Sequence, residues 1–592
     1  MIKVDEKPNV FTFDDGSKIW NHTFDTFSAK VYVPTTDLPE DIINYGYEAP
    51  YLLVFSTEDF NSLTDEKAKA YADETKLSLI AREHASSVVY IYPTCESGWS
   101  GANEELFKEL ISNSKIHEYH KDGYAILNNR FTKECDGYAI RGAIFRTCLF
   151  GRGESADYIA KYLIKDIEGD GLWGPADIAP TVCVLDSLSI MPVIERHDMP
   201  IVSIRNTVEV NEHIENSVDD CYIILTDVGD NSPATTNDTN DEKIANGSDD
   251  SNGGNTTKGT AKTDTCVTSS DIDYPVIYHE FIKDYMRWGW HGELNTSPDF
   301  ETLGMVKEPV IFTLNTSADN CGDDKGTTEH RVGCLAYYNK DLFANGPAPL
   351  LLCFHGGGDS AMHIAEVSEW YRVANDHDFL LVCIENHLNS TATEMMELIE
   401  KLVGKYDIDR TRIYGTGFSM GGCKSWDLYQ EYPQVFAGLA PMDATFDVGF
   451  NVFGNKVDKD INSDIMVPIF YAGGEITPLP ELPFQAQKCL DRMAYVININ
   501  KVKKTYDVKL DEKDNWENKI WGINGDKEEK FFDESRNSTL TLQYFESEDG
   551  NCYSVFGSIS DQGHECRYHT CEHAWRFLSQ FRRTSDGELV II

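Results

Sequence analysis

A single serine, Ser419, interrupts a run of small and apolar residues in the sequence RIYGTGFSMGGCKSW (412–426). It stands at the centre of a G-x-S-x-G pattern, between a strand-like segment, RIYGT, and a helical segment, CKSWDLYQEY. A serine in a sharp strand-to-helix turn projects its hydroxyl from the edge of a sheet, and flanking glycines leave room for the strained backbone. Ser419 is therefore predicted to be a nucleophile.

A glycine-rich segment lies about 60 residues upstream of this serine. His355 opens the sequence HGGG (355–358), directly after the apolar run PLLLCF. Acyl transfer builds an oxyanion, which needs backbone N–H groups aimed at it, and glycines let the backbone come close. The predicted donors are Gly357 and Met420, the residue after the nucleophile.

The base that activates the serine is expected late in the chain, on a loop after the last strand. His564 meets this requirement, because it precedes the closing helix in GHECRYHTCEHAWRFL. His569 and His573 are the competing candidates. The same stretch also carries Cys566 and Cys571, but the spacing fits no standard zinc pattern, so we expect no metal and no organic cofactor.

The acid of a triad in the order Ser, Asp or Glu, His should follow a strand between Ser419 and His564. Glu475, in VPIFYAGGEITPLPELP, comes just after a strand and two glycines and is the favoured candidate. Asp443, at the end of the preceding strand in FAGLAPMDA, is the alternative.

The elements that must hold these residues alternate along the chain. Near-continuous apolar runs indicate strands that are buried on both faces: PLLLCF, FLLVCIEN, TRIYGTG, FAGLAPMD and MVPIFYAGG. The segment ATEMMELIEKLVGKY has helical spacing and lies between two of them. Such alternation predicts an α/β fold with a mostly parallel sheet and helices on both faces.

Together these segments resemble a known enzyme family over about residues 330–585. The matching stretches are LLLCFHGGG, DIDRTRIYGTGFSMGG, YPQVFAGLAPMDA, VPIFYAGGEITP and GHECRYHTCEHAWRFLSQF. They resemble the esterase family that includes polyhydroxybutyrate depolymerases and feruloyl or acetyl-xylan esterases. The resemblance implies an α/β-hydrolase fold and hydrolysis of a carboxylic ester. The family usually has Asp where Glu475 stands.

The first half of the chain repeats the order of the second. Six blocks recur collinearly, for example EAPYLLVFSTED (48–59) with PAPLLLCFHGGG, and RTCLFGRGESADY (146–158) with RTRIYGTGFSMGG. This predicts an internal duplication and two tandem α/β-hydrolase-like domains with mostly parallel sheets, over 1–295 and 296–592. Residues 228–273 have almost no large apolar side chains and are interpreted as a disordered insertion in the first domain.

The first copy lacks most of the chemistry of the second. Ser155 falls opposite Ser419, but Asp157 replaces the second glycine, and STED (56–59) stands where the second copy has HGGG. Tyr274 falls opposite His564. A carboxylate beside an oxyanion would repel it. The first domain is therefore predicted to be non-catalytic, with homo-oligomerisation, covering of the active site or stabilisation as its open roles.

Composition limits the partners. The chain of 592 residues has a formal net charge of −46, which disfavours nucleic acid and anionic membranes. We expect no signal peptide in MIKVDEKPNVFTFDDG and no membrane span, and we interpret the 15 cysteines as reduced thiols of a cytoplasmic protein.

The leading hypothesis is thus a serine carboxylesterase that acts on a small or polymeric ester through an acyl-enzyme. A peptidase of the same fold, and a non-catalytic binding protein of two inactive domains, are the alternatives.

Overall fold

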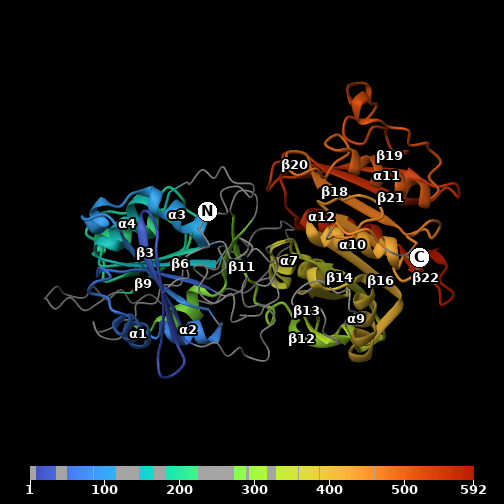
Figure 1. Ribbon diagram of the computed structural model, residues 1–592. Helices are drawn as coiled ribbons and strands as arrows, with labels where there is room; N and C mark the ends of the chain where they lie inside the picture. The colour runs from blue at the N-terminus through green and yellow to red at the C-terminus, as the bar shows by residue number, and fades with distance from the viewer. Residues whose placement is uncertain are drawn as a thin grey trace, which may run out of the picture.

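The protein is described from a computed structural model. The residues it describes are 9–34, 50–84, 86–114, 146–165, 180–224, 272–288, 293–315, 329–357, 359–385, 387–452, 454–457 and 460–592. Figure 1 shows the N-terminal and C-terminal halves as separate lobes, each built around one large sheet.

Within the described residues, nine strands form the first sheet, in the order β1-β2-β3-β5-β4-β6-β7-β8-β9. The neighbours from β5 to β9 pair in parallel, and the β1–β2, β2–β3 and β3–β5 pairs are antiparallel. Their bounds are β1 Asn9–Thr12, β2 Lys18–Thr23, β3 Phe27–Val33, β4 Tyr51–Phe55, β5 Val88–Pro93, β6 Thr147–Arg152, β7 Val182–Asp186, β8 Ile201–Ile204 and β9 Cys221–Ile224.

The second sheet has ten strands in the described part of the chain, in the order β12-β13-β15-β14-β16-β17-β18-β21-β20-β19. The pairs from β15 to β21 are parallel, and both edges are antiparallel. The bounds are β12 Met305–Asn315, β13 Glu329–Asn339, β14 Ala348–Phe354, β15 Leu380–Ile384, β16 Ile408–Phe418, β17 Gly438–Met442, β18 Ile469–Gly474, β19 Lys527–Asp533, β20 Ser538–Glu546 and β21 Cys552–Ile559.

Helices cover both faces of each sheet, so successive strand residues are buried in different layers. In β14, Leu351 and Cys353 pack under α7, α8 and α12, whereas Leu352 and Phe354 pack under α9, α10 and α11. These helices are α7 Ala361–Val367, α8 Trp370–Asp376, α9 Ala392–Lys405, α10 Met420–Glu431, α11 Gln487–Ile499 and α12 Tyr568–Leu578. The first sheet lies between α3 Glu104–Ser114, α4 Glu154–Tyr162 and α5 Val208–Ser217 on one face, and α1 Asp65–Glu74, α2 Leu77–Glu83 and α6 Tyr274–Ile277 on the other.

The two sheets share one topology. The series β2-β3-β5-β4-β6-β7-β8-β9 and β12-β13-β15-β14-β16-β17-β18-β21 have the same sequence order and the same strand directions. The predicted α/β class with mostly parallel sheets is confirmed, and each of the five apolar runs forms a strand, β14 to β18. The origin by duplication stays a prediction, as does the division at 295/296, which falls inside strand β11 (Glu293–Thr296).

The insertion predicted at 228–273 lies outside the described residues, except for its last two. No helix in the described ranges combines the length and apolar content needed to cross a membrane.

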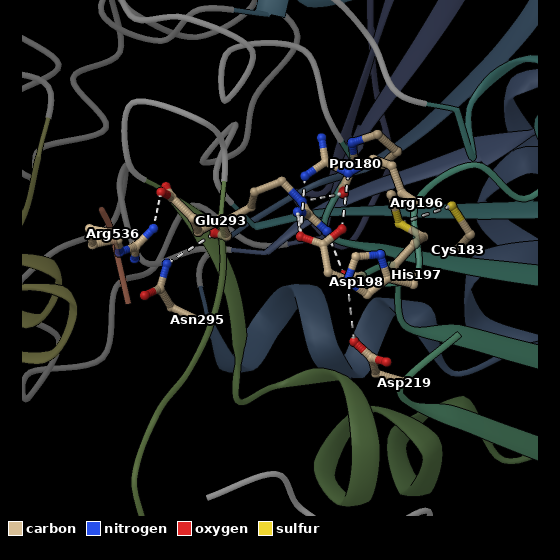
Figure 2. A network of polar contacts seen from close by, with 11 residues as sticks. Pro180, Cys183, Arg196, His197, Asp198, Asp219, Glu293, Asn295 and Arg536 are labelled. Carbon is tan, nitrogen blue, oxygen red and sulfur yellow. Dashed lines mark hydrogen bonds and ion pairs between the residues drawn. The ribbon is translucent and has the colours of Figure 1, made fainter. Parts of the chain in front are cut away.

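A short hairpin joins the two halves. Strand β10 (Tyr285–Trp288) pairs antiparallel with β11, and Met286 packs into the core of the second sheet. Figure 2 shows the polar contacts on either side of this hairpin. The guanidinium of Arg287 is fully buried and donates to the carbonyl of Pro180 (2.9 Å) and to the carboxylate of Asp198 (2.8 Å). Glu293 on β11 forms an ion pair with Arg536 of the second half.

We expect Arg287→Ala to lower the free energy of unfolding by about 3 kcal/mol, because the change leaves the carboxylate of Asp198 short of a buried partner. The matched control is Arg410→Ala, which removes an ion pair with Glu400 whose two side chains are more than half exposed. That control should cost less than about 1 kcal/mol. Urea unfolding of the full chain, followed by circular dichroism, measures both. Equal midpoints for the two variants would contradict the structural role of Arg287.

Candidate active site

Ser419 lies in a strained turn between β16 and α10. Its φ is 54° and its ψ is −119°, a backbone conformation that non-glycine residues adopt rarely. Two backbone hydrogen bonds hold the turn: the N–H of Ser419 donates to Met442 O (3.1 Å), and its carbonyl accepts from Cys423 N (3.0 Å). The predicted turn is thus present, and the serine side chain is half-buried at the end of the sheet.

The glycines of the motif allow α10 to approach the strands. A Cβ atom on Gly417 would lie 2.2 Å from the carbonyl oxygen of Gly421, and a Cβ on Gly421 would lie 2.0 Å from that of Phe354. Both distances are far below van der Waals contact with backbone atoms that cannot move independently. The G-x-S-x-G spacing therefore follows from the close packing of helix and strand.

The loop after β14 lies against this turn. A Cβ on Gly356 would lie 3.4 Å from Ser419 Cβ, and one on Gly357 would lie 2.6 Å from Met420 Sδ. The buried ring of His355 fixes the loop from below, through Gly356 O (2.7 Å) and Glu385 O (2.8 Å). Met420 is the first residue of α10, where backbone N–H groups have no acceptor within the helix. The structure thus brings Gly357 and Met420 together beside Ser419.

His564 reaches the same place from the loop after β21. Its ring centre lies 4.7 Å from that of Phe418, the residue before Ser419, and the side chain is almost fully buried. Burial lowers the pKa of His564 to about 3, against the opposing charge of Glu565. The imidazole is therefore neutral at neutral pH, as a base must be.

The two competing histidines lie elsewhere. His569 and His573 are on α12, with their rings 5.0 Å apart, and the ring of His573 lies tilted against Phe531 of β19, with their centres 3.8 Å apart. Cys566 and Cys571 face each other, with their sulfurs 3.5 Å apart. Across the described residues, no group of three or more His, Cys, Asp or Glu side chains is arranged to hold a metal ion.

The carboxylate that contacts the histidine is Glu481, and not Glu475. Nδ1 of His564 bonds Oε1 of Glu481, and both side chains are 1% exposed. Glu475 is half-buried and accepts a hydrogen bond from Ser558 Oγ (2.8 Å) on β21. The expected contact of Glu475 with the base is therefore wrong.

The path of the loop after β18 explains why Glu481, and not Glu475, contacts His564. After β18, the N–H groups of Glu475 and Ile476 still bond to Ile559 O and Gln562 O, at 2.9 and 3.1 Å, so the chain continues beside β21. The chain turns over the site only at Glu481, which Thr477 Oγ1 supports with a hydrogen bond of 2.9 Å. The available sequence signal was a second carboxylate in the same loop, in PLPELP.

Asp443, the alternative acid, lies next to Glu481. It is buried at the end of β17 with a φ of 51°, and its side chain interacts with that of Glu481. The site thus contains two adjacent buried carboxyl groups, of which Glu481 carries the contact to His564.

The first half contains the same turn with a glycine in it. Gly153 has a φ of 57° and a ψ of −126°, donates to Asp186 O (2.9 Å) and accepts from Asp157 N (2.9 Å), which matches the bonding of Ser419. The strand register agrees, because Phe55 pairs with Gly151 as Phe354 pairs with Gly417.

The sequence analysis placed Ser155 opposite Ser419, and the structure shows that this is wrong: Gly153 is the counterpart of Ser419. Ser155 lies two residues further on, fully buried, and its Oγ bonds the backbone N–H (2.9 Å) and carbonyl (3.0 Å) of Arg152. No side chain occupies the nucleophile position, because glycine stands there. Both copies have two glycines two residues apart, GRG (151–153) and GTG (415–417), and pairing these in the sequence shifts the alignment by two residues.

Comparison with known proteins gives esterase-type α/β-hydrolase relatives over part of the chain. The sequence is 28% identical over 156 residues to poly(3-hydroxyalkanoate) depolymerase C from Paucimonas lemoignei, and 26% identical over 137 residues to the bifunctional acetylxylan esterase/xylanase XynS20E from Neocallimastix patriciarum. The matches cover 23% and 22% of this chain, and only 37% and 19% of the two relatives. No family model matches the sequence.

Solved structures of the same kind are similar at low identity. Acetyl xylan esterase from Aspergillus awamori is 13% identical with a TM-score of 0.31, over 46% of this chain and 99% of that one. The feruloyl esterase module from Clostridium thermocellum, complexed with sinapinate, is 14% identical with a TM-score of 0.26, over 48% and 92%.

Two glycine variants test the geometry of the turn. We expect Gly421→Ala to slow the reaction of Ser419 with a fluorophosphonate by at least about 10²-fold, because the new methyl group displaces α10 from β14. Gly404→Ala is the control: Gly404 is exposed in α9, and its Cβ would meet no atom within 4 Å. It should stabilise the protein by about 0.5–1 kcal/mol and leave the labelling rate unchanged. Similar labelling of both variants would show that the close approach is not required.

Proposed function

We propose that the C-terminal half is a serine carboxylesterase domain that hydrolyses carboxylic esters through an acyl-enzyme. The observation that carries the proposal is the arrangement of a strained Ser419, the glycine loop beside it and the buried pair of His564 and Glu481. The esterase relatives support it over part of the chain. A feruloyl or acetyl ester, or a polyhydroxyalkanoate, is the proposed kind of substrate.

The chemistry follows from the contacts. His564 uses Nδ1 to bond Glu481, so Nε2 is the nitrogen that takes the proton from Ser419 Oγ. The serine oxygen attacks the ester carbonyl carbon, and the backbone N–H groups of Gly357 and Met420 stabilise the oxyanion. His564 then protonates the departing alcohol. Water, deprotonated by the same nitrogen, attacks the acyl-enzyme and releases the acid.

The buried carboxylate gives this cycle its electrostatic support. The imidazolium that forms during each proton transfer lies against Glu481 in a site of low dielectric, where one negative charge stabilises it strongly. Thr477 holds that carboxylate in place.

We further propose that the N-terminal half is not catalytic. Gly153 supplies no hydroxyl at the turn, and at the end of β4 Ser56 uses its Oγ to bond the carbonyl of Glu58 (2.7 Å), which closes the loop on itself. Trp99 packs against Phe55 there and donates Nε1–H to Ser56 O (2.6 Å). A loop that is covered by a tryptophan and hydrogen-bonded to it suits a structural role better than an oxyanion site.

The serine is tested by Ser419→Ala, which should lower kcat for a p-nitrophenyl acyl ester by about 10⁴-fold or more, because the nucleophile is lost. A fluorophosphonate probe should label the wild-type chain once, on Ser419, and should not label the variant. Intact-mass detection of a second adduct in the N-terminal half would contradict its proposed inactivity. Wild-type activity in Ser419→Ala would exclude the esterase site itself.

The acid is tested by the pair Glu481→Gln and Glu475→Gln. We expect the first to lower kcat by about 10²–10⁴-fold, since the amide cannot stabilise the imidazolium. The second changes a carboxylate whose hydrogen bond, in the described part of the chain, comes from Ser558. We therefore expect kcat of Glu475→Gln to stay within about threefold of wild type. If the two variants exchanged ranks, Glu475 would be the acid.

A further inference from the structure

A second carboxyl group, Asp443, is built into the site behind Glu481. It follows the last residue of β17 and is 3% exposed. Its own N–H donates to Ala472 O (2.9 Å), and its Oδ1 accepts from Gly474 N (3.3 Å). The backbone is held at a φ of 51°, which Asp tolerates better than most residues. The position is therefore fixed by the ends of β17 and β18.

Glu481 lacks one hydrogen bond that Asp443 is placed to supply. Its Oε1 bonds His564 Nδ1 and Thr477 Oγ1. Its Oε2 is buried and makes no hydrogen bond of ordinary geometry among the described residues, although the N–H of Gly474, which bonds Asp443 Oδ1, also acts on this carboxylate. A buried acceptor without a donor is costly. The side chain that interacts with Glu481 from the other side is Asp443, which donates only when it is protonated.

The surroundings favour that proton. Two adjacent buried carboxyl groups do not both ionise, because like charges in low dielectric repel strongly. Burial raises the pKa of Asp443 well above its usual range, and Glu481 and Glu565 raise it further. Tyr471, which faces the pair from β18, is neutral as well, since burial raises the pKa of its phenol.

We propose that Asp443 is a positioning residue that stays protonated and donates a hydrogen bond to Glu481 Oε2. The inference rests on the proposed function. It extends the series of interacting side chains to four residues: Ser419, His564, Glu481 and Asp443. The proton stays on Asp443 throughout the reaction. The carboxyl pair then carries a single negative charge, and both oxygens of Glu481 have donors.

The experiment compares a side chain at position 443 that can donate a hydrogen bond without ionising with a residue that cannot donate one. Asp443→Asn keeps an N–H donor and suits the positive φ, whereas Asp443→Gly suits the same φ and has no donor. Asp447→Asn makes the same substitution at an exposed position of the same segment and serves as the control. The readout is the rate at which a fluorophosphonate labels Ser419 in the full chain, measured from pH 5 to 10, which needs no knowledge of the natural ester.

At pH 7 we expect Asp443→Asn to label within about tenfold of wild type, and Asp443→Gly to label at least about 10²-fold more slowly because Glu481 shifts. Wild type should lose rate at alkaline pH, where Asp443 gives up its proton and the donor disappears. The Asn variant, which has no such proton, should keep its rate, and Asp447→Asn should follow wild type.

The results separate the two proposals. A wild-type chain that is not labelled on Ser419 removes the proposed function. A labelled wild type overturns the role of Asp443 if the Asn variant is as slow as the Gly variant, if the Gly variant is as fast as wild type, or if the Asn variant shows the same alkaline loss. Should the Gly variant fail to fold, the pH profile of the Asn variant alone decides.

Discussion

The close approach of α10 to the ends of β14 and β16 is the constraint on which the rest of the site depends. At Gly417 and Gly421 the backbones come so near that a single added methyl group would overlap a carbonyl oxygen. This packing places the first turn of α10 beside the loop after β14. It also forces Ser419 into a positive φ, and the strain is held by bonds to Met442 and Cys423 on either side. The positions of Ser419, of the N-terminus of α10 and of the glycine loop thus all follow from one contact.

The second requirement is electrical. The site buries His564 together with Glu481, away from water. Burial is the main cause that raises the pKa of both carboxyl groups, Asp443 and Glu481. In the proposed mechanism, the positive partner of Glu481 forms only when the imidazole of His564 takes a proton. In that mechanism His564 is neutral at rest and charged only in the transition state. The carboxylate of Glu481 therefore stabilises the transition state selectively.

Much of this arrangement is local, and that part can be predicted from the sequence. Buried parallel strands appear as apolar runs, and the turn at Ser419 needs glycines at fixed offsets, so both were found. His564 follows from chain order. The carboxylate that contacts His564 does not, because hydrogen bonds to Ile559 and Gln562, more than 80 residues away, set the path of the loop from 475 to 481. Spacing cannot show which of two carboxylates in one loop turns over the site.

The turn at Gly153 shows which features of the site belong to the fold and which to the chemistry. It reproduces the dihedral angles, the strand register and both backbone hydrogen bonds of the turn at Ser419, with no side chain at its tip. The geometry is therefore a property of a strand that passes into a helix at this point of the sheet, and it forms without the serine. Glycine adopts a positive φ at less cost than serine, because it has no Cβ atom, so the turn at Ser419 is less favourable than the turn at Gly153. The proposed function explains why serine and not glycine stands at this turn: its hydroxyl is the proposed nucleophile.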